Sequence, residues 1–185
     1  MLQRIALALA GLFGLVAVGV LGARRVSARL ANGATAPEFT LQAAKGDEVH
    51  TVDLKSALAA GPVVLYFFPK SFTPGCTMEA HLFSERIGDF TQLGATVIGV
   101  SADDIATQQR FSNHECNAAF LVASDPGLTV AKKYSAALVG SIANRTSYVI
   151  APDGTIAYAY TNLDASKHVE NTLAALRELN APAKT

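Results

Sequence analysis

The stretch Phe67–Cys76, which reads FFPKSFTPGC, decides the fold. It ends an apolar run at Pro69 and places a cysteine directly behind Thr-Pro-Gly. The residues leading into it, 63–68, read VVLYFF and are apolar on both faces, which is typical of a central strand in a sheet covered on each side. A helix is expected to begin near Cys76. The stretch therefore predicts a strand, a turn and a helix whose first turn carries a thiol.

The position of Cys76 favours a reactive thiol. Unpaired N–H groups and the positive end of the helix dipole stabilise an anion at this point, and the thiolate is the form that attacks other molecules. The alternative is a small buried apolar side chain. A dithiol oxidoreductase carries a second cysteine three residues later, where this chain has Glu79, so the sequence disfavours dithiol exchange.

The rest of the chain alternates between strand and helix patterns and then ends in a hairpin. The expected strands are residues 38–41, 49–52, 63–68, 95–100, 120–123, 147–150 and 156–160. The expected helices are residues 54–60, 77–90, 103–115, 128–134 and 165–179. This order predicts an α/β fold with a mixed central sheet, parallel early and antiparallel late, and helices on both faces.

The chain has 185 residues, half of them hydrophobic, which is enough for one domain with its own core and an appendage. We expect a linker over 27–37, the folded domain over 38–180 and a C-terminal tail over 181–185. Only two cysteines are present, so the fold does not depend on disulfides.

The N-terminal segment is expected to lie outside this domain. Residues 5–23 carry no charge, and as a helix they would span roughly 29 Å, about the thickness of a bilayer core. We therefore predict a membrane helix within an anchor or signal segment, residues 1–26. A small-x-small cleavage site is missing near Gly22, which favours an uncleaved anchor; cleavage would instead export the domain to the periplasm. The side of the membrane stays open.

The charge distribution argues against a nucleic-acid partner. The 15 basic residues balance the 15 acidic ones, but four arginines and no acidic residue lie in the first 30 positions, leaving 11 basic against 15 acidic residues in the remainder. Phosphate backbones are bound mainly by Lys and Arg, and a mildly acidic domain without a basic stripe does not provide them.

The sequence around Cys76 resembles a known family. Pro69, Thr73 and Cys76 match the Pro-xxx-Thr/Ser-xx-Cys signature of peroxiredoxins, and YFFPKSFTPGCTMEA is similar to the bacterioferritin comigratory protein, or peroxiredoxin Q, branch. The resemblance covers most of residues 34–179, including APEFTL, VIGVS, SDP and NRTSYVI.

This resemblance implies a thioredoxin fold in its peroxiredoxin variant. It also implies an antioxidant enzyme, a thioredoxin-dependent peroxiredoxin that reduces hydrogen peroxide and small organic hydroperoxides. The expected partners are the peroxide and thioredoxin or another thiol reductant. No metal or bound cofactor is expected, and the chain is expected to act as a monomer or weak dimer.

The resemblance also implies roles for individual residues. Arg145 would lie beside the thiol, where its guanidinium stabilises the thiolate and donates to the peroxide oxygens. Thr73 would hold the peroxide through its hydroxyl, Pro69 would shield the pocket from water, and Glu79 would orient Arg145 or cap the helix. The alternatives are a simple helix-capping pair for Thr73 and Glu79, and a surface position for Arg145.

Regeneration of the oxidised cysteine is the point at which the chain departs from the family pattern. Many members of the branch carry a resolving cysteine five residues after the first, where this chain has His81. Cys116 is the internal candidate; otherwise it is a structural thiol and an external thiol reduces Cys76 directly. His50, His81 and His168 are interpreted as surface or packing residues.

A different class of function remains as the rival hypothesis. A membrane-tethered thioredoxin-like protein could bind metal or deliver copper through Cys76, Cys116 and a histidine. This requires ligands that converge on one centre. His81 lies five residues from Cys76, roughly 140° around a helix, so these two side chains are expected to diverge.

Overall fold

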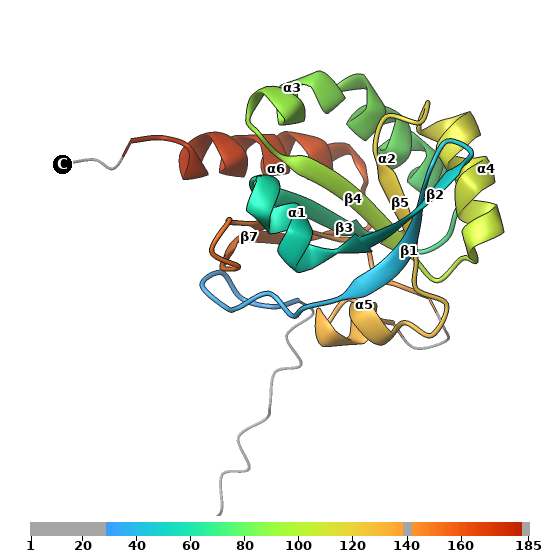
Figure 1. The fold of residues 1–185 in the computed structure, drawn as a ribbon, viewed down its shortest axis with the longest axis horizontal. Helices are drawn as coiled ribbons and strands as arrows, with labels where there is room; N and C mark the ends of the chain where they lie inside the picture. Colours follow the sequence, from blue (N-terminus) through green and yellow to red (C-terminus); the bar gives the residue numbers. More distant parts are fainter. Residues whose placement is uncertain (1–28, 139–141, 183–185) are drawn as a thin grey trace, which may run out of the picture.

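The computed structural model describes residues 29–138 and 142–182 of the chain (Figure 1). The predicted membrane helix, residues 5–23, and the end of the C-terminal tail lie outside these residues. Across the part of the chain that is described, no helix is both long enough and apolar enough to cross a membrane.

The described chain forms one mixed sheet of seven strands in the order β2-β1-β5-β4-β3-β6-β7. The strands are β1 (Thr40–Lys45), β2 (Glu48–Asp53), β3 (Val63–Phe67), β4 (Thr96–Ser101), β5 (Leu121–Ser124), β6 (Thr146–Ile150) and β7 (Ile156–Thr161). Strands β3, β4 and β5 are parallel, which confirms a mixed sheet.

The strand directions differ from the prediction at the start of the chain. Strands β1 and β2 are antiparallel to each other, and β1 is antiparallel to β5, so the sheet is antiparallel at both edges and parallel only in the centre. The reason is local: Gly46 adopts φ +62° in the two-residue turn after β1, a conformation that suits glycine and reverses the chain at once.

Helices cover both faces of the sheet, as predicted. They are α1 (Leu54–Ala60), α2 (Pro74–Glu85), α3 (Ile87–Gln92), α4 (Ile105–Glu115), α5 (Thr129–Lys133) and α6 (Ser166–Leu179). Helices α1 and α5 pack on one core, whereas α2, α3, α4 and α6 pack on a second core across the sheet. Figure 1 shows α2, α3 and α6 together on one side and α5 on the other.

The predicted helix over residues 77–90 is in fact two helices. Helix α2 begins earlier, at Pro74, because proline at the first helical position lacks only an N–H that would be unpaired there. Arg86, with φ −103° and ψ 8°, ends α2 and precedes α3. Gly88 follows in the first turn of α3, where its conformational freedom weakens helix continuity.

A buried polar network holds the loop between β3 and α2. The Ser71 N–H donates to Asp103 Oδ2 at 2.8 Å, and the Ser71 hydroxyl donates to Gln108 Oε1 at 3.0 Å. The Gln108 amide in turn donates to Ser101 Oγ at 2.8 Å. Phe72, with φ +61°, places its ring edge-on to Phe111 of α4, with the ring centroids 5.3 Å apart. The loop entering α2 is thus fixed to β4 and α4.

Candidate active site

Cys76 is the third residue of α2 and is only 2% exposed. It begins a buried stripe at helical spacing, Cys76, Glu79, Ala80 and Phe83, which packs against the sheet. The N–H groups of Cys76 and Thr77 both donate to the carbonyl oxygen of Thr73, at 3.0 and 2.9 Å. The predicted place of the thiol, in the first turn of a helix behind the Thr-Pro-Gly turn, is confirmed.

Thr73 and Pro69 lie on the loop that enters α2. Thr73 is the N-cap residue, but its side chain does not cap the helix; its hydroxyl donates to the Lys70 carbonyl at 2.9 Å. Thr73 and Pro69 are both half-buried. Because Glu79 points away from the helix start toward Arg145, the two residues do not form a capping pair.

Arg145, just before β6, reaches across to α2 and is 5% exposed. Its Nη2 lies 3.4 Å from Cys76 Sγ, and its Nη1 forms a buried ion pair with Glu79 Oε2. Its Nε donates to the Leu163 carbonyl at 2.9 Å. All three nitrogens of the guanidinium are therefore engaged, and the alternative of a surface position for Arg145 is wrong.

Gly75 gives the guanidinium room to approach the sulfur. A Cβ atom at position 75 would lie 3.1 Å from Arg145 Nη2, closer than side chains ordinarily come. The close approach of Arg145 therefore explains why a glycine occupies the last position of the Thr-Pro-Gly turn.

Glu79 is fully buried between the arginine and α6. Burial raises the pKa of its carboxyl to about 8, against the opposing effect of the Arg145 charge. Its second oxygen, Oε1, has no hydrogen-bond partner and lies 3.7 Å from Nδ1 of His168. The carboxyl group therefore faces a cation on one side and an imidazole on the other.

His168 is the residue that sequence reasoning missed. It is fully buried in the first turn of α6, its Nδ1 lies 2.7 Å from Ser147 Oγ, and its Nε2 lies 3.0 Å from the Asn162 carbonyl. Burial, together with the Arg145 charge, lowers the pKa of the ring to about 4. The interpretation of His168 as a surface or packing residue does not describe these contacts.

A weak sequence signal for His168 exists in hindsight. His168, Thr172 and Ala175 recur at spacings of four and three residues and are all buried, so they form a helical stripe beside the apolar one. The Leu163 carbonyl, which accepts from Arg145 Nε, was also not predicted. It is a backbone group, so no residue type in the sequence indicates it.

Cys116 ends α4 and is fully buried in the same core as Cys76. Burial raises the pKa of its thiol, and the neighbouring Glu115 raises it further. Ser84 of α2 donates a hydrogen bond to the Cys116 carbonyl at 3.0 Å. Both cysteines are free thiols.

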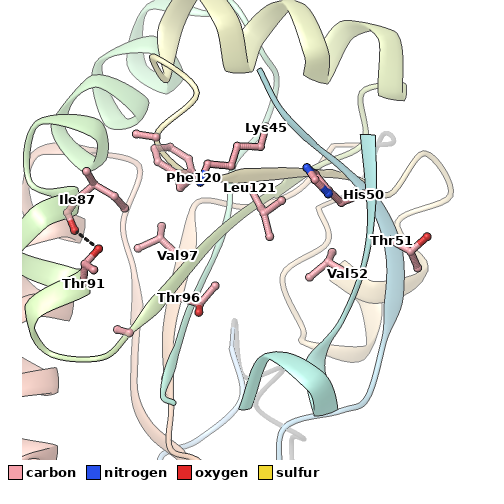
Figure 2. A pocket seen from close by; sticks show the side chains of 12 residues that line it. Lys45, His50, Thr51, Val52, Ile87, Thr91, Thr96, Val97, Phe120 and Leu121 are labelled. Atoms are coloured by element: carbon pink, nitrogen blue, oxygen red, sulfur yellow. Dashed lines mark hydrogen bonds between the residues drawn. The ribbon is translucent and has the colours of Figure 1, made fainter. Parts of the chain in front are cut away.

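A cavity of about 560 Å³ lies apart from this cluster (Figure 2). Figure 2 shows Lys45, His50, Ile87 and Phe120 around it, and none of the predicted site residues lines it. Among residues 29–138 and 142–182, no three His, Cys, Asp or Glu side chains gather at one centre that could hold a metal ion. His81 pairs instead with Glu115 at 2.9 Å. The copper-delivery hypothesis therefore finds no support.

Comparison with known proteins identifies the family. The AhpC/TSA family matches residues 32–159. The chain is 36% identical over 159 residues to "Peroxiredoxin Q, chloroplastic" of Oryza sativa subsp. japonica, covering 84% of this chain and 71% of the relative. It is 34% identical over 155 residues to the protein of that name from Arabidopsis thaliana, covering 82% and 69%.

Solved structures agree with this assignment. The crystal structure of peroxidoxin BcpB from Mycobacterium tuberculosis matches with a TM-score of 0.74 and 29% identity, covering 82% of this chain and 99% of that one. The family match, over residues 32–159, spans the strand, turn and helix that carry Cys76. The chain belongs to the AhpC/TSA family of peroxiredoxins, with their thioredoxin-like fold, and is a thiol-dependent peroxidase.

Proposed function

We propose that Cys76 is the peroxidatic cysteine and that Arg145 is its principal catalytic partner. The observation that carries this proposal is the 3.4 Å contact between Arg145 Nη2 and Cys76 Sγ, at the N-terminus of α2. A guanidinium and a helix N-terminus both stabilise negative charge, and both meet at this sulfur. The substrates are hydrogen peroxide and small organic hydroperoxides.

In the proposed reaction, the Cys76 thiolate attacks the terminal oxygen of the peroxide. A sulfur–oxygen bond forms while the oxygen–oxygen bond breaks, so the sulfur is oxidised by two electrons to sulfenic acid. The other oxygen leaves as water or an alcohol after taking up the proton that the thiol released to solvent. Arg145 is aimed at the charge that develops on the oxygens as the bond breaks.

The remaining site residues support this step. Thr73 lies one turn before Cys76 and offers a hydroxyl to the peroxide, while Pro69 limits the access of water to the loop. Glu79 holds Nη1 of Arg145 through the buried ion pair. We also propose that the chain works as a monomer or weak dimer; sedimentation of the reduced protein at several concentrations tests this.

We propose that an external thiol, thioredoxin or a similar donor, reduces the sulfenic acid. The thiol forms a mixed disulfide with Cys76 and releases water, and a second thiol then frees Cys76. Internal resolution by Cys116 stays the alternative prediction. The burial of Cys116 and its raised pKa favour the external route, because the thiolate is the attacking form.

Intact mass spectrometry after one equivalent of peroxide tests both proposals. We expect wild type and Cys116→Ser to gain one oxygen, and Cys76→Ser to gain none. Loss of two hydrogens in wild type, absent in Cys116→Ser, would show a disulfide and establish Cys116 as the resolving cysteine. If Cys76 stays reduced under these conditions, its assignment as the peroxidatic residue is wrong.

We also propose that residues 1–26 tether this peroxidase to a membrane, as the uncharged stretch 5–23 supports. Cleavage of the segment would instead deliver the domain to the periplasm. Fractionation of cells that express the full chain tests the tether: we expect the protein in membranes after carbonate washing, and removal of residues 1–26 should release it. A full chain that is recovered without membranes and with residue 1 intact contradicts the tether.

A further inference from the structure

The hydrogen-bond partners of His168 determine where its ring carries a proton. Nε2 faces the Asn162 carbonyl, which only accepts, so Nε2 must be protonated to donate at 3.0 Å. In the neutral ring, Nδ1 is then an acceptor, and the Ser147 hydroxyl donates to it at 2.7 Å. Both ring nitrogens are then engaged, because the lone pair of Nδ1 accepts from Ser147 and the N–H of Nε2 donates to Asn162, so the neutral ring offers no donor to α2.

The atom of α2 that lies beside this ring is Glu79 Oε1. The other carboxyl oxygen, Oε2, is bound to Arg145, whereas Oε1 is buried without a hydrogen-bond partner, 3.7 Å from Nδ1. An ionised Oε1 would be a buried anionic oxygen that receives no hydrogen bond, which is unfavourable. A proton on the carboxyl group, or on the ring beside it, lowers this cost.

The charges of the site give a second, independent reason for such a proton. With Cys76 as thiolate and Glu79 as carboxylate, one guanidinium would have to balance two anions that are almost entirely buried. A buried uncompensated charge is costly, and the carboxylate would compete with the sulfur for Arg145.

We propose that Glu79 and His168 together carry one proton in addition to the Nε2–H of the ring, so that the pair is neutral overall and the charge of Arg145 is left to the Cys76 sulfur. His168 is then a positioning residue: it acts through Glu79 and touches neither the sulfur nor the peroxide. The inference rests on the proposed role of Cys76 and Arg145.

Two arrangements of the same proton satisfy the geometry. In one, Glu79 is a carboxylic acid and the ring is neutral, with Nδ1 accepting from Ser147. In the other, the ring is an imidazolium whose Nδ1–H faces Ser147 Oγ and a Glu79 carboxylate. Burial raises the pKa of Glu79 and lowers that of His168, so the carboxylic acid is the form we expect at neutral pH.

Other ionisable groups also face the pair. Cys76, Arg145 and Tyr66 lie around Glu79, and Arg145, Asp164 and the ring of Tyr160 lie around His168. Burial raises the pKa of Tyr66 well above its ordinary value, and the hydrogen bond from the Ser166 N–H lowers that of Asp164. Neither of these two groups changes charge near pH 8, where Glu79 releases the proton.

Spectroscopy of the reduced full-length protein locates the proton without relying on activity. The infrared difference between wild type and Glu79→Gln reveals a protonated carboxyl group, and nitrogen NMR of labelled histidine, assigned through His168→Phe, reports the ring state. We expect a carboxylic acid band that Glu79→Gln removes, together with a neutral His168 protonated at Nε2. A missing band with an imidazolium also supports the shared proton. The proposal is overturned if the carboxylic acid band is missing and the ring is neutral. It is also overturned if the carboxylic acid band is present and the ring is an imidazolium.

The pH dependence of Cys76 oxidation, measured in a single turnover, shows whether the proton of the Glu79–His168 pair affects Arg145. Glu79 loses its proton near pH 8, whereas the amide of Glu79→Gln keeps a donor at every pH. We therefore compare the rate of Cys76 oxidation at about pH 9 with the rate at about pH 7. This ratio should be about tenfold lower in wild type than in Glu79→Gln. His81→Gln, which alters an exposed histidine on the same helix, should keep the wild-type ratio. Equal ratios in wild type and Glu79→Gln overturn the link between the proton and Arg145, even where oxidation of Cys76 is established.

Discussion

Nη2 of Arg145 lies 3.4 Å from Sγ of Cys76, although 69 positions separate the two residues in the chain. The approach is fixed from two further directions, because Nη1 binds Glu79 and Nε donates to the Leu163 carbonyl. A planar guanidinium with three anchored nitrogens holds its charge in one place. This arrangement makes the contact with the sulfur specific to arginine.

Replacement of Arg145 should slow the reaction of Cys76 with peroxide. We expect Arg145→Met to lower the second-order rate by about 100-fold or more, because it removes both the charge and the donors aimed at the breaking bond. Arg145→Lys should restore part of the rate, since it keeps the charge but loses the planar fork. Stopped-flow measurement of thiol oxidation provides the rates.

The exposed pair of Arg86 and Asp89 supplies the matched control for this series. Arg86→Met removes an arginine from the helix boundary after α2 and should leave the oxidation rate close to that of wild type. An unchanged rate in Arg145→Met would contradict the proposed role of the guanidinium.

Gly75→Ala should lower the rate without destabilising the fold. The added Cβ would come within 3.1 Å of Arg145 Nη2 and push it away from the sulfur, while alanine in a helix is favoured over glycine by up to about 1 kcal/mol. We expect a rate loss of about tenfold at an unchanged or higher melting temperature. Gly88→Ala is the control, because nothing lies within 4 Å of its Cβ position; an equal loss there would refute the steric explanation.

Ser71→Ala should loosen the loop that enters α2. It removes the donor to Gln108 Oε1, a buried acceptor, and should lower the free energy of unfolding by about 1–3 kcal/mol. Urea denaturation measures this loss. Thr91→Ala, which removes a hydroxyl bonded only within α3, should cost less; similar losses in the two variants would argue against a special role for the Ser71 network.

The buried ring of His168 should make the fold sensitive to acid. An unfolded histidine takes up a proton below about pH 6.5, whereas burial lowers the pKa of His168 to about 4, so the folded state binds fewer protons between these values. The free energy of unfolding should therefore fall as the pH falls through this window, by up to roughly 3 kcal/mol from this group. His168→Phe should flatten that part of the curve in urea titrations, while His50→Gln should not; an identical pH dependence in all three proteins would contradict the assignment.

Much of the fold follows from local pattern in the sequence. The run of apolar residues before Pro69 predicts β3, the Thr-Pro-Gly turn predicts the start of α2, and the Ala-Pro-Asp-Gly turn predicts the hairpin of β6 and β7. These features depend on neighbours in the chain: apolar side chains indicate the strand, and the backbone preferences of proline and glycine indicate the turns. The break between α2 and α3 escapes prediction because Gly88 is its one local signal, and a single glycine does not by itself end a helix.

The site residues could be predicted only where the residue type and its neighbours in the sequence indicate a chemical role. A cysteine behind a Pro-Gly turn is recognisable, and the resemblance to peroxiredoxins predicts the arginine beside it. The helical stripe indicates at most that His168 is buried; its contacts are not recognisable, because they depend on how α6 packs against β6 and α2, a long-range arrangement. The antiparallel pairing of β1 with β2 follows from the turn at Gly46, whereas the antiparallel pairing of β1 with β5 depends on where this hairpin docks.

The burial of Cys76 has a consequence for the catalytic cycle. At 2% exposure, the sulfur is closed to a protein that carries a redox-active dithiol, the reductant proposed above. Recycling by such a protein would require the first turn of α2 to unwind and expose the oxidised side chain. While that turn stays helical, a second peroxide can react with the same sulfur and convert it to the irreversible sulfinic form. The time that the turn takes to unwind would therefore determine how much peroxide the enzyme tolerates before it is inactivated.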